Sequence, residues 1–252
     1  MLPAVSPPLS ARQRALVADT WDFRASAERS AELRLTRLHR ELVATQAPTP
    51  LCELAMSARE QERRHIGLCD ALARRFGWSD EPSEPTAHEP IGPSERGLED
   101  RLLFEMVAFG CVTETVNVAM LVTVSRQVAD PGVRETVASI LKDEISHSQL
   151  GWGYLQYVFE SRSIAWLSAW LPQMFAGAGV DEIYQPDADE RNVPELAHFG
   201  ELSFAQRVEI FRAVAADVIL PGFERVQLDT GPCRQWLSRW EPQLANPSPP
   251  LS

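Results

Sequence analysis

The chain has 252 residues, of which 44% are hydrophobic and 23% charged, and its formal net charge is −11. This size indicates one large domain or two small ones, and the composition excludes a disordered, collagen-like or repeat protein. The acidic balance argues against a nucleic-acid partner, whose phosphates require clustered lysine and arginine. No secretory signal or membrane span is evident, and the cysteines form no C-x-x-C pair. We therefore expect a cytoplasmic protein with reduced thiols that contacts neither nucleic acid nor membrane.

Apolar residues recur at three- and four-residue steps almost throughout the chain, which predicts an all-α protein. The third predicted helix is apolar on most sides, as a buried central helix would be, and its Gly110 offers room for a close approach of another helix. Proline or glycine breaks should separate the helices. Four long helices are expected at about 20–45, 51–76, 98–129 and 133–159.

The rest of the chain is less regular. An aromatic segment at 164–175 is followed by an irregular acidic stretch at 181–200. A further amphipathic helix is expected at about 203–220, where Pro221 and Gly222 should end it.

The connections between the long helices indicate how they pack. Short breaks join the first helix to the second and the third to the fourth, so each pair should form an antiparallel hairpin. A proline-rich linker at 79–97 joins the two pairs and is long enough, when extended, to run the length of a helix. This is the connectivity of ferritin-like four-helix bundles. The predicted divisions are an N-terminal segment (1–19), the bundle (20–160) and a C-terminal helical extension packed on it (161–252).

The second and fourth predicted helices each carry a Glu-x-x-His motif, Glu62 to His65 and Glu144 to His147. Side chains three residues apart share one helix face, so each pair can bind one metal ion, and carboxylate and imidazole ligands suit iron or manganese. Both motifs lie inside apolar stripes, where an ionised carboxylate is costly unless it is paired or metal-bound. The alternative is a metal-free network of Glu with Arg or His, which the repetition on matching helices disfavours. A third copy, Glu195 to His198, lies in the irregular stretch and should be at the surface.

A dinuclear site in such a bundle needs one further Glu from each remaining helix. On the third helix we prefer Glu114 to Glu105, because Glu114 lies at nearly the same depth from the intervening turn as Glu144. On the first helix the choice between Glu28 and Glu32 stays open. Glu28 lies in the apolar stripe, whereas the position of Glu32 along its helix is slightly closer to the depth of Glu62 on the second helix. We prefer Glu28, because the apolar stripe predicts that its side chain is buried.

Several further features accompany these motifs, namely Trp21, Ala27-Glu28, the Ala47-Pro48 break and Leu220-Pro221-Gly222. With them, residues 21–159 resemble the ferritin-like superfamily of non-haem di-iron carboxylate proteins, and most closely a bacterial group within it. Members of this family often carry Asp-Glu-x-x-His, in which the Asp orients a His across the site. Asp143 is this residue in the second motif. Gln61 replaces it in the first, and its amide can still accept a hydrogen bond.

The resemblance implies a non-haem di-iron oxidoreductase that activates dioxygen and oxidises a small organic molecule, with electrons from a separate donor or from the substrate. Manganese or a mixed pair can replace the two iron ions. Two alternatives stay open, a ferroxidase that handles iron and a non-catalytic metal-binding bundle. The implied ligands, with no catalytic residue beyond them, are Glu28, Glu62, His65, Glu114, Glu144 and His147.

The C-terminal extension of about 90 residues and the long linker fit a compact cage subunit poorly, so we expect a monomer or homodimer. Its aromatic residues Trp166, Trp170 and Phe175 either wall a pocket over the bundle or simply pack an additional helix, and packing is the preferred interpretation.

Overall fold

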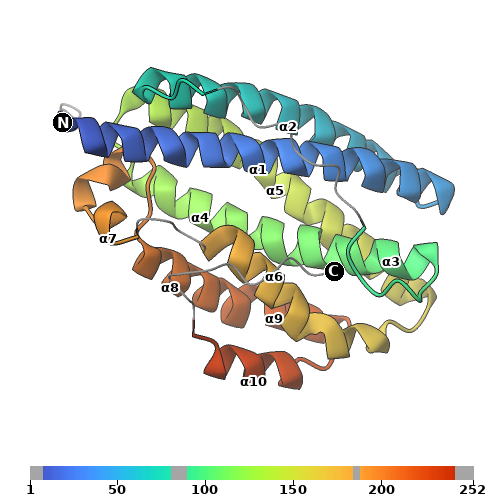
Figure 1. The fold of residues 1–252 in the computed structure, drawn as a ribbon. Helices are drawn as coiled ribbons and strands as arrows, with labels where there is room; N and C mark the ends of the chain where they lie inside the picture. The colour runs from blue at the N-terminus through green and yellow to red at the C-terminus, as the bar shows by residue number, and fades with distance from the viewer. Residues whose placement is uncertain (1–7, 81–89, 184–187, 242–252) are drawn as a thin grey trace.

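The computed structural model describes residues 8–80, 90–183 and 188–241, and these residues are almost entirely helical, with no β-strand among them. The all-α prediction is therefore confirmed. Four long helical segments lie side by side (Figure 1). They are α1 (Ala11–Ala44), α2 (Thr49–Phe76), a third segment made of α3 (Leu98–Glu105), the π-helical η1 (Met106–Thr113) and α4 (Glu114–Gln127), and α5 (Pro131–Ser161).

The first helix begins at Ala11, nine residues before its predicted start at about residue 20, so the predicted start of this helix is wrong. Ser10 and Gln13 form a capping box at this end, in which each side chain accepts a hydrogen bond from the other residue's backbone N–H, at 3.2 and 2.9 Å. Leu16 and Val17 are buried in the added turns. The helix therefore extends the core of the bundle into the segment predicted to precede it.

An ion pair ties the end of α2 to the start of α5. Gly77 ends α2 with a left-handed φ of 107°, which glycine adopts without strain. Asp130 caps α5 by accepting a hydrogen bond from Val133 N–H at 3.0 Å, and the same carboxylate accepts two bonds from Arg75, at 2.7 and 2.6 Å. The two predicted hairpins are thereby joined at one end of the bundle.

The packing follows the predicted hairpins. The first helix packs along α2, the third segment packs along α5, and α2 packs along α5. The end of α2 and the start of α3 lie at opposite ends of the bundle (Figure 1). Residues 81–89 of the predicted linker lie outside the described residues, and the described residues 90–97 are not helical.

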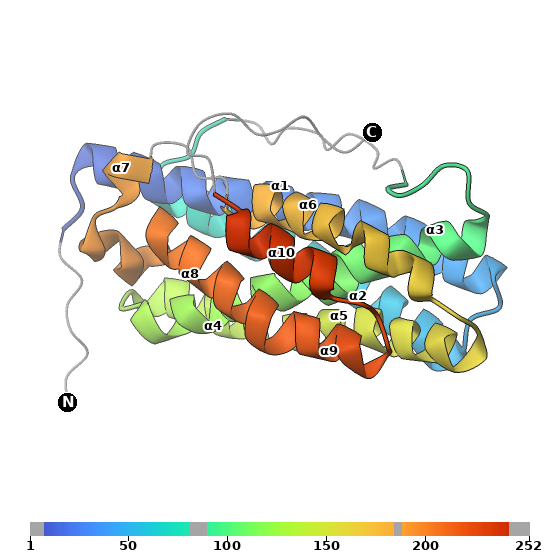
Figure 2. The ribbon, with the colours of Figure 1, turned by 90° about the horizontal axis from the view of Figure 1, so that it is seen from below.

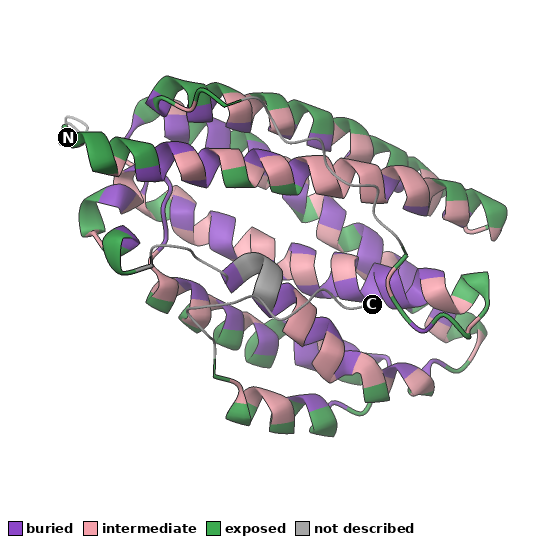
Figure 3. Ribbon diagram, viewed as in Figure 1, coloured by how far each residue is buried: buried purple, intermediate pink, exposed green. Residues whose placement is uncertain are grey.

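The third segment forms the interior of the molecule, as predicted for a central helix (Figure 3). Among the described residues, Leu98–Gln127 is the one helical stretch long and apolar enough to cross a membrane, and 61% of its most apolar window is buried inside the protein. A core helix has the same properties, since it is covered by α5 on one side and by C-terminal helices on another. The chain's cysteines are all free thiols, and Cys69 and Cys111 are buried.

Two glycines allow η1 and α5 to touch. A Cβ added at Gly110 would lie 2.6 Å from the Cα of Gly151, and one added at Gly151 would lie 2.4 Å from the carbonyl carbon of Gly110. No side chain fits between these backbones, so the close approach expected at Gly110 is confirmed. Gly110 precedes Glu114 by one helical turn and Gly151 follows His147 by one turn, so this contact brings Glu114 toward His147.

The C-terminal extension forms a layer over the third segment (Figure 2). Helices α6 and α8 pack on η1 and α4, and α10 packs on α6. Phe175 is fully buried against Phe211 and Phe223, and Trp170 meets Phe104 edge to face, as the packing interpretation predicts. The elements of the layer are η2 (Ala165–Trp170), α6 (Leu171–Ile183), α7 (Ala188–Arg191), η3 (Pro194–Phe199), α8 (Phe204–Val214), η4 (Ala215–Ile219), α9 (Leu220–Arg225) and α10 (Gly231–Arg239).

The predicted end of the last amphipathic helix at Pro221 and Gly222 is wrong. Helical backbone continues from α8 through the π-helical η4 into α9, which ends at Arg225. Pro221 lies in the first turn of α9 after the wider π turn, a place where its missing N–H is tolerated. Gly222 packs on the indole of Trp152, where a Cβ would lie 2.6 Å from the ring carbon Cη2. This glycine therefore serves packing rather than termination.

Candidate metal centre

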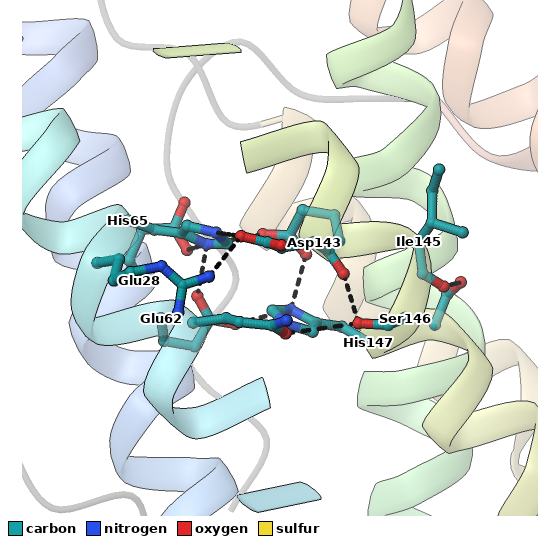
Figure 4. A network of polar contacts seen from close by, with 11 residues as sticks. Glu28, Glu62, His65, Asp143, Ile145, Ser146 and His147 are labelled. Carbon is teal, nitrogen blue, oxygen red and sulfur yellow. Dashed lines mark hydrogen bonds and ion pairs between the residues drawn. The ribbon is translucent and has the colours of Figure 1, made fainter. Parts of the chain in front are cut away.

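All of the predicted ligand residues are buried, and they converge inside the bundle from its four long segments. Figure 4 shows four of them close together, Glu28, Glu62, His65 and His147. Their ligand atoms form two groups, within each of which all atoms lie within 4.8 Å of one another. The first group contains Glu28, Glu62, His65 and Glu144, and the second contains Glu62, Glu114, Glu144 and His147. The two groups share Glu62 and Glu144, which is the arrangement of two adjacent positions connected by two carboxylates.

The shared carboxylates each present one oxygen to each imidazole. Glu62 places Oε2 3.3 Å from His65 Nδ1 and Oε1 3.1 Å from His147 Nδ1. Glu144 places Oε1 3.4 Å from His65 Nδ1 and Oε2 3.0 Å from His147 Nδ1. Glu28 Oε2 lies 3.6 Å from His65 Nδ1 and belongs to the first group alone, as Glu114 belongs to the second. Both Nδ1 atoms therefore face the space between the carboxylates.

The outer nitrogen of each imidazole is held by a residue from the other hairpin, as Figure 4 shows for His65 and Asp143. His65 Nε2 lies 3.2 Å from Asp143 Oδ2, which also accepts a hydrogen bond of 2.9 Å from Arg64. His147 Nε2 lies 2.8 Å from Gln61 Oε1. Asp143 and Gln61 thus lie where the sequence places residues that orient a His across the site. Sequence reasoning missed Arg64, because an exposed arginine gives no signal of a partner on another helix.

The alternative acidic residues lie elsewhere. Glu32, one turn from Glu28, forms an ion pair of 2.8 Å with Arg63. Glu105 is buried beside Arg37 and lies 3.6 Å from Arg34. Both choices made from the sequence, Glu28 and Glu114, are therefore the residues that the structure brings into the cluster.

The third Glu-x-x-His copy takes no part in the cluster. Glu195 is exposed, as predicted, whereas His198 is half-buried rather than on the surface. The carbonyl oxygen of His198 accepts hydrogen bonds of 3.1 Å from the backbone N–H groups of Ala129 and Asp130, which draws the residue against the start of α5.

Without a metal ion, protons have to balance the cluster. Burial, with the charge of Glu62, raises the pKa of Glu28 well above its usual value, and burial with the charge of Glu144 does the same for Glu114. Burial opposes charge on Glu62 and Glu144, yet the two imidazoles lower the pKa of both. Burial also opposes protonation of the imidazoles, but the carboxylates raise the pKa of His65 to about 12 and of His147 to about 11. Metal ions would have to replace these protons.

The residues present fit a pair of metal ions. Both carboxylate oxygens of Glu144, and Nδ1 of His147, are buried without a hydrogen bond, although Glu144 Oε2 lies 3.0 Å from His147 Nδ1 and Oε1 lies 3.4 Å from His65 Nδ1. Buried polar atoms without hydrogen bonds are rare, and a cation between them would supply their missing partner. The donor set of oxygens and imidazole nitrogens is suited to iron and manganese, and four carboxylates would balance two divalent cations. The buried cluster can therefore hold metal.

The chain matches no family model, and neither a curated protein nor a solved structure is significantly similar to it. The geometry of the buried cluster is therefore the basis for assigning a function.

Proposed function

We propose that the protein is a ferritin-like oxidoreductase with a dinuclear non-haem metal site, which activates dioxygen to oxidise a small organic molecule. The observation that supports this proposal is the pair of overlapping ligand groups that share Glu62 and Glu144. Two helical hairpins with one long connection, each supplying a Glu and a Glu-x-x-His motif, also agree with a ferritin-like bundle. Iron is the proposed metal, and manganese or a mixed pair is compatible with the same ligands.

The chain's residues have separate roles in this proposal. Glu62 and Glu144 would connect the two positions, and Glu28 and Glu114 would each complete one of them. Asp143 and Gln61 accept the hydrogen bond from the outer N–H of each imidazole, which leaves Nδ1 free to bind metal. Burial of the cluster keeps bulk water away from the reacting species. The bound ions would supply the electrons and the open coordination positions that dioxygen requires.

Anaerobic loading followed by exposure to oxygen tests the proposal. The metal-free protein should bind two Fe(II) per chain and then consume dioxygen, with a change in visible absorbance. Glu114→Ala and Glu144→Ala should each lose this reaction, because a buried ligand is removed from the cluster. Glu32→Ala is the control, since Glu32 lies on α1 but pairs with Arg63. Normal loading and reaction in both ligand variants would show that the proposal is wrong.

Size-exclusion chromatography of the same preparation tests the alternative function, iron storage. The proposed oxidoreductase should elute as a monomer or dimer that takes up about two iron ions per chain. The layer of C-terminal helices, which occupies one outer side of the bundle, favours such a compact particle over a shell subunit (Figure 2). A large shell that accumulates many iron ions as mineral would instead identify a ferroxidase, and a chain that binds no metal would identify a bundle without this function.

A further inference from the structure

The two halves of the cluster match ligand for ligand but differ in the residue behind each imidazole. Glu28 corresponds to Glu114, and the two Glu-x-x-His motifs correspond to each other. Behind His65 lies the carboxylate of Asp143, and behind His147 lies the amide of Gln61. Each of these two residues immediately precedes the Glu of its motif, so the difference is one of chemistry and not of position.

The difference places one additional negative charge beside the first position. The Asp143 side chain is 14% exposed, whereas its second partner, Arg64, is 57% exposed, so solvent screens the arginine charge more strongly. The Gln61 contact is short, at 2.8 Å, but it carries no charge. Hydrogen bonds to an ionised acceptor are roughly twice as strong as neutral ones, and an anionic partner makes an imidazole a better metal ligand.

The inference that follows rests on the proposed function, because it concerns the same pair of ions. We propose that the two positions differ in affinity, that the position of Glu28 and His65 binds its ion more tightly, and that Gln61 sets the difference. Changes in such outer partners typically alter metal affinity about 10- to 100-fold, and we expect a difference of that size. Gln61 acts in this proposal as a positioning residue, since it reaches the ion only through His147.

An anaerobic titration with Mn(II), monitored by calorimetry and by electron paramagnetic resonance, tests the order in which the two positions bind their ions. Two steps should be resolved, separated about 10- to 100-fold. The spectrum of an isolated Mn(II) ion should dominate up to one equivalent, before the coupled pair forms. Glu114→Gln should keep the tight step and lose the weak one, and Glu28→Gln should do the reverse, because each residue belongs to one group only. Retention of the tight step in Glu28→Gln would overturn the order.

Two substitutions test the role of Gln61. Asp143 shows that an Asp at this place in the motif can reach the imidazole across the site, so Gln61→Asp should tighten the weak step and bring the two steps together. Asp143→Asn, which removes the charge at constant size, should weaken the tight step. Gln149→Asp and Glu60→Gln make the same charge changes at exposed positions and should leave both steps unchanged.

The possible failures are distinguishable. Binding of no Mn(II) by the unaltered protein would contradict the proposed function and this inference together. Binding of two equivalent ions would contradict the inference alone and leave the dinuclear site intact. Separate steps that Gln61→Asp does not change would overturn the role assigned to Gln61.

Discussion

Glu28 and Glu32 lie one turn apart on α1, yet Glu28 alone reaches the cluster. The apolar stripe favoured Glu28 and the depth along the helix favoured Glu32. Burial was the better guide, because a ligand has to face the core, while a long side chain tolerates an offset of about one turn along the axis. The contact of Gln61 with His147 could be expected only in outline, since the sequence indicates the acceptor and a His across the site but not the length of their contact.

Glu105 provides a prediction at the residue scale that is independent of metal. Its side chain is 1% exposed beside Arg37, with Arg34 at 3.6 Å as a second partner. Arg37→Ala should lower the free energy of unfolding by about 2–3 kcal/mol, less than for a completely broken buried pair, because Arg34 remains.

Urea unfolding measures this change, with Arg234→Ala as the control. Arg234 pairs with Glu224 at the surface, where both side chains are nearly half exposed, so its loss should destabilise the protein much less than the loss of Arg37. Equal destabilisation by the two substitutions would contradict the burial of the Glu105 pair.

At the scale of elements, the helices could be predicted more reliably than their ends and irregularities. The capping residues Ser10 and Gln13 are visible in the sequence, but the weak apolar pattern that follows them hid the true start of α1. The π-helical η1 could not be predicted, because a run of residues that is apolar on all sides gives no phase from which a widened turn can be detected. The prediction at Pro221 was wrong for a related reason. Proline ends a helix where the backbone N–H that it lacks is required, and in the first turn of α9 it is not required.

The contact between Gly110 and Gly151 gives the element-scale prediction. Gly110→Ala should destabilise the protein by about 1–3 kcal/mol, because its Cβ would meet backbone that cannot rotate away. Gly67→Ala is the matched control on α2. No neighbouring atom lies within 4 Å of the added Cβ, so this substitution should stabilise the protein by about 0.5–1 kcal/mol.

Urea unfolding measures the free energy of unfolding of both glycine variants, which should change in opposite directions. Gly110→Ala should also weaken metal binding at the position of Glu114, which lies one turn along the same helical segment. A stabilised Gly110→Ala variant would show that the two helices do not touch as described.

At the scale of the whole molecule, the length of the linker predicted how the helices pair, whereas the composition of the C-terminal extension did not predict where the extension packs. The long linker predicted the two hairpins, because chain length limits where the third helix can begin. The side of the bundle that the extension covers could not be predicted, since the third segment is apolar in nearly every direction and accepts a neighbour on any of them. Its place is decided by contacts distant in sequence, such as Trp152 with Phe223.

Metal removal gives the prediction at this scale. Each ligand group takes three residues from one hairpin and one from the other, so ions bind only when the hairpins are docked. A ligand at a hundredfold excess over its Kd stabilises the folded state by about 2.7 kcal/mol per site. A chelator should therefore lower the Tm measured by calorimetry. Glu62→Gln should abolish that shift, Glu32→Gln should retain it, and an unaltered Tm in the native sequence would contradict metal binding.

The shared carboxylates give the centre an approximate internal twofold relation, in which each hairpin repeats the contribution of the other. Every substitution in one half consequently has a counterpart in the other half, made in the same chain and the same solvent. Comparing such partners shows whether the two halves respond equally to the same chemical change. Position 61 and position 143 are where the residues behind the two imidazoles differ, so exchanging these two side chains tests how much of any difference between the halves they cause.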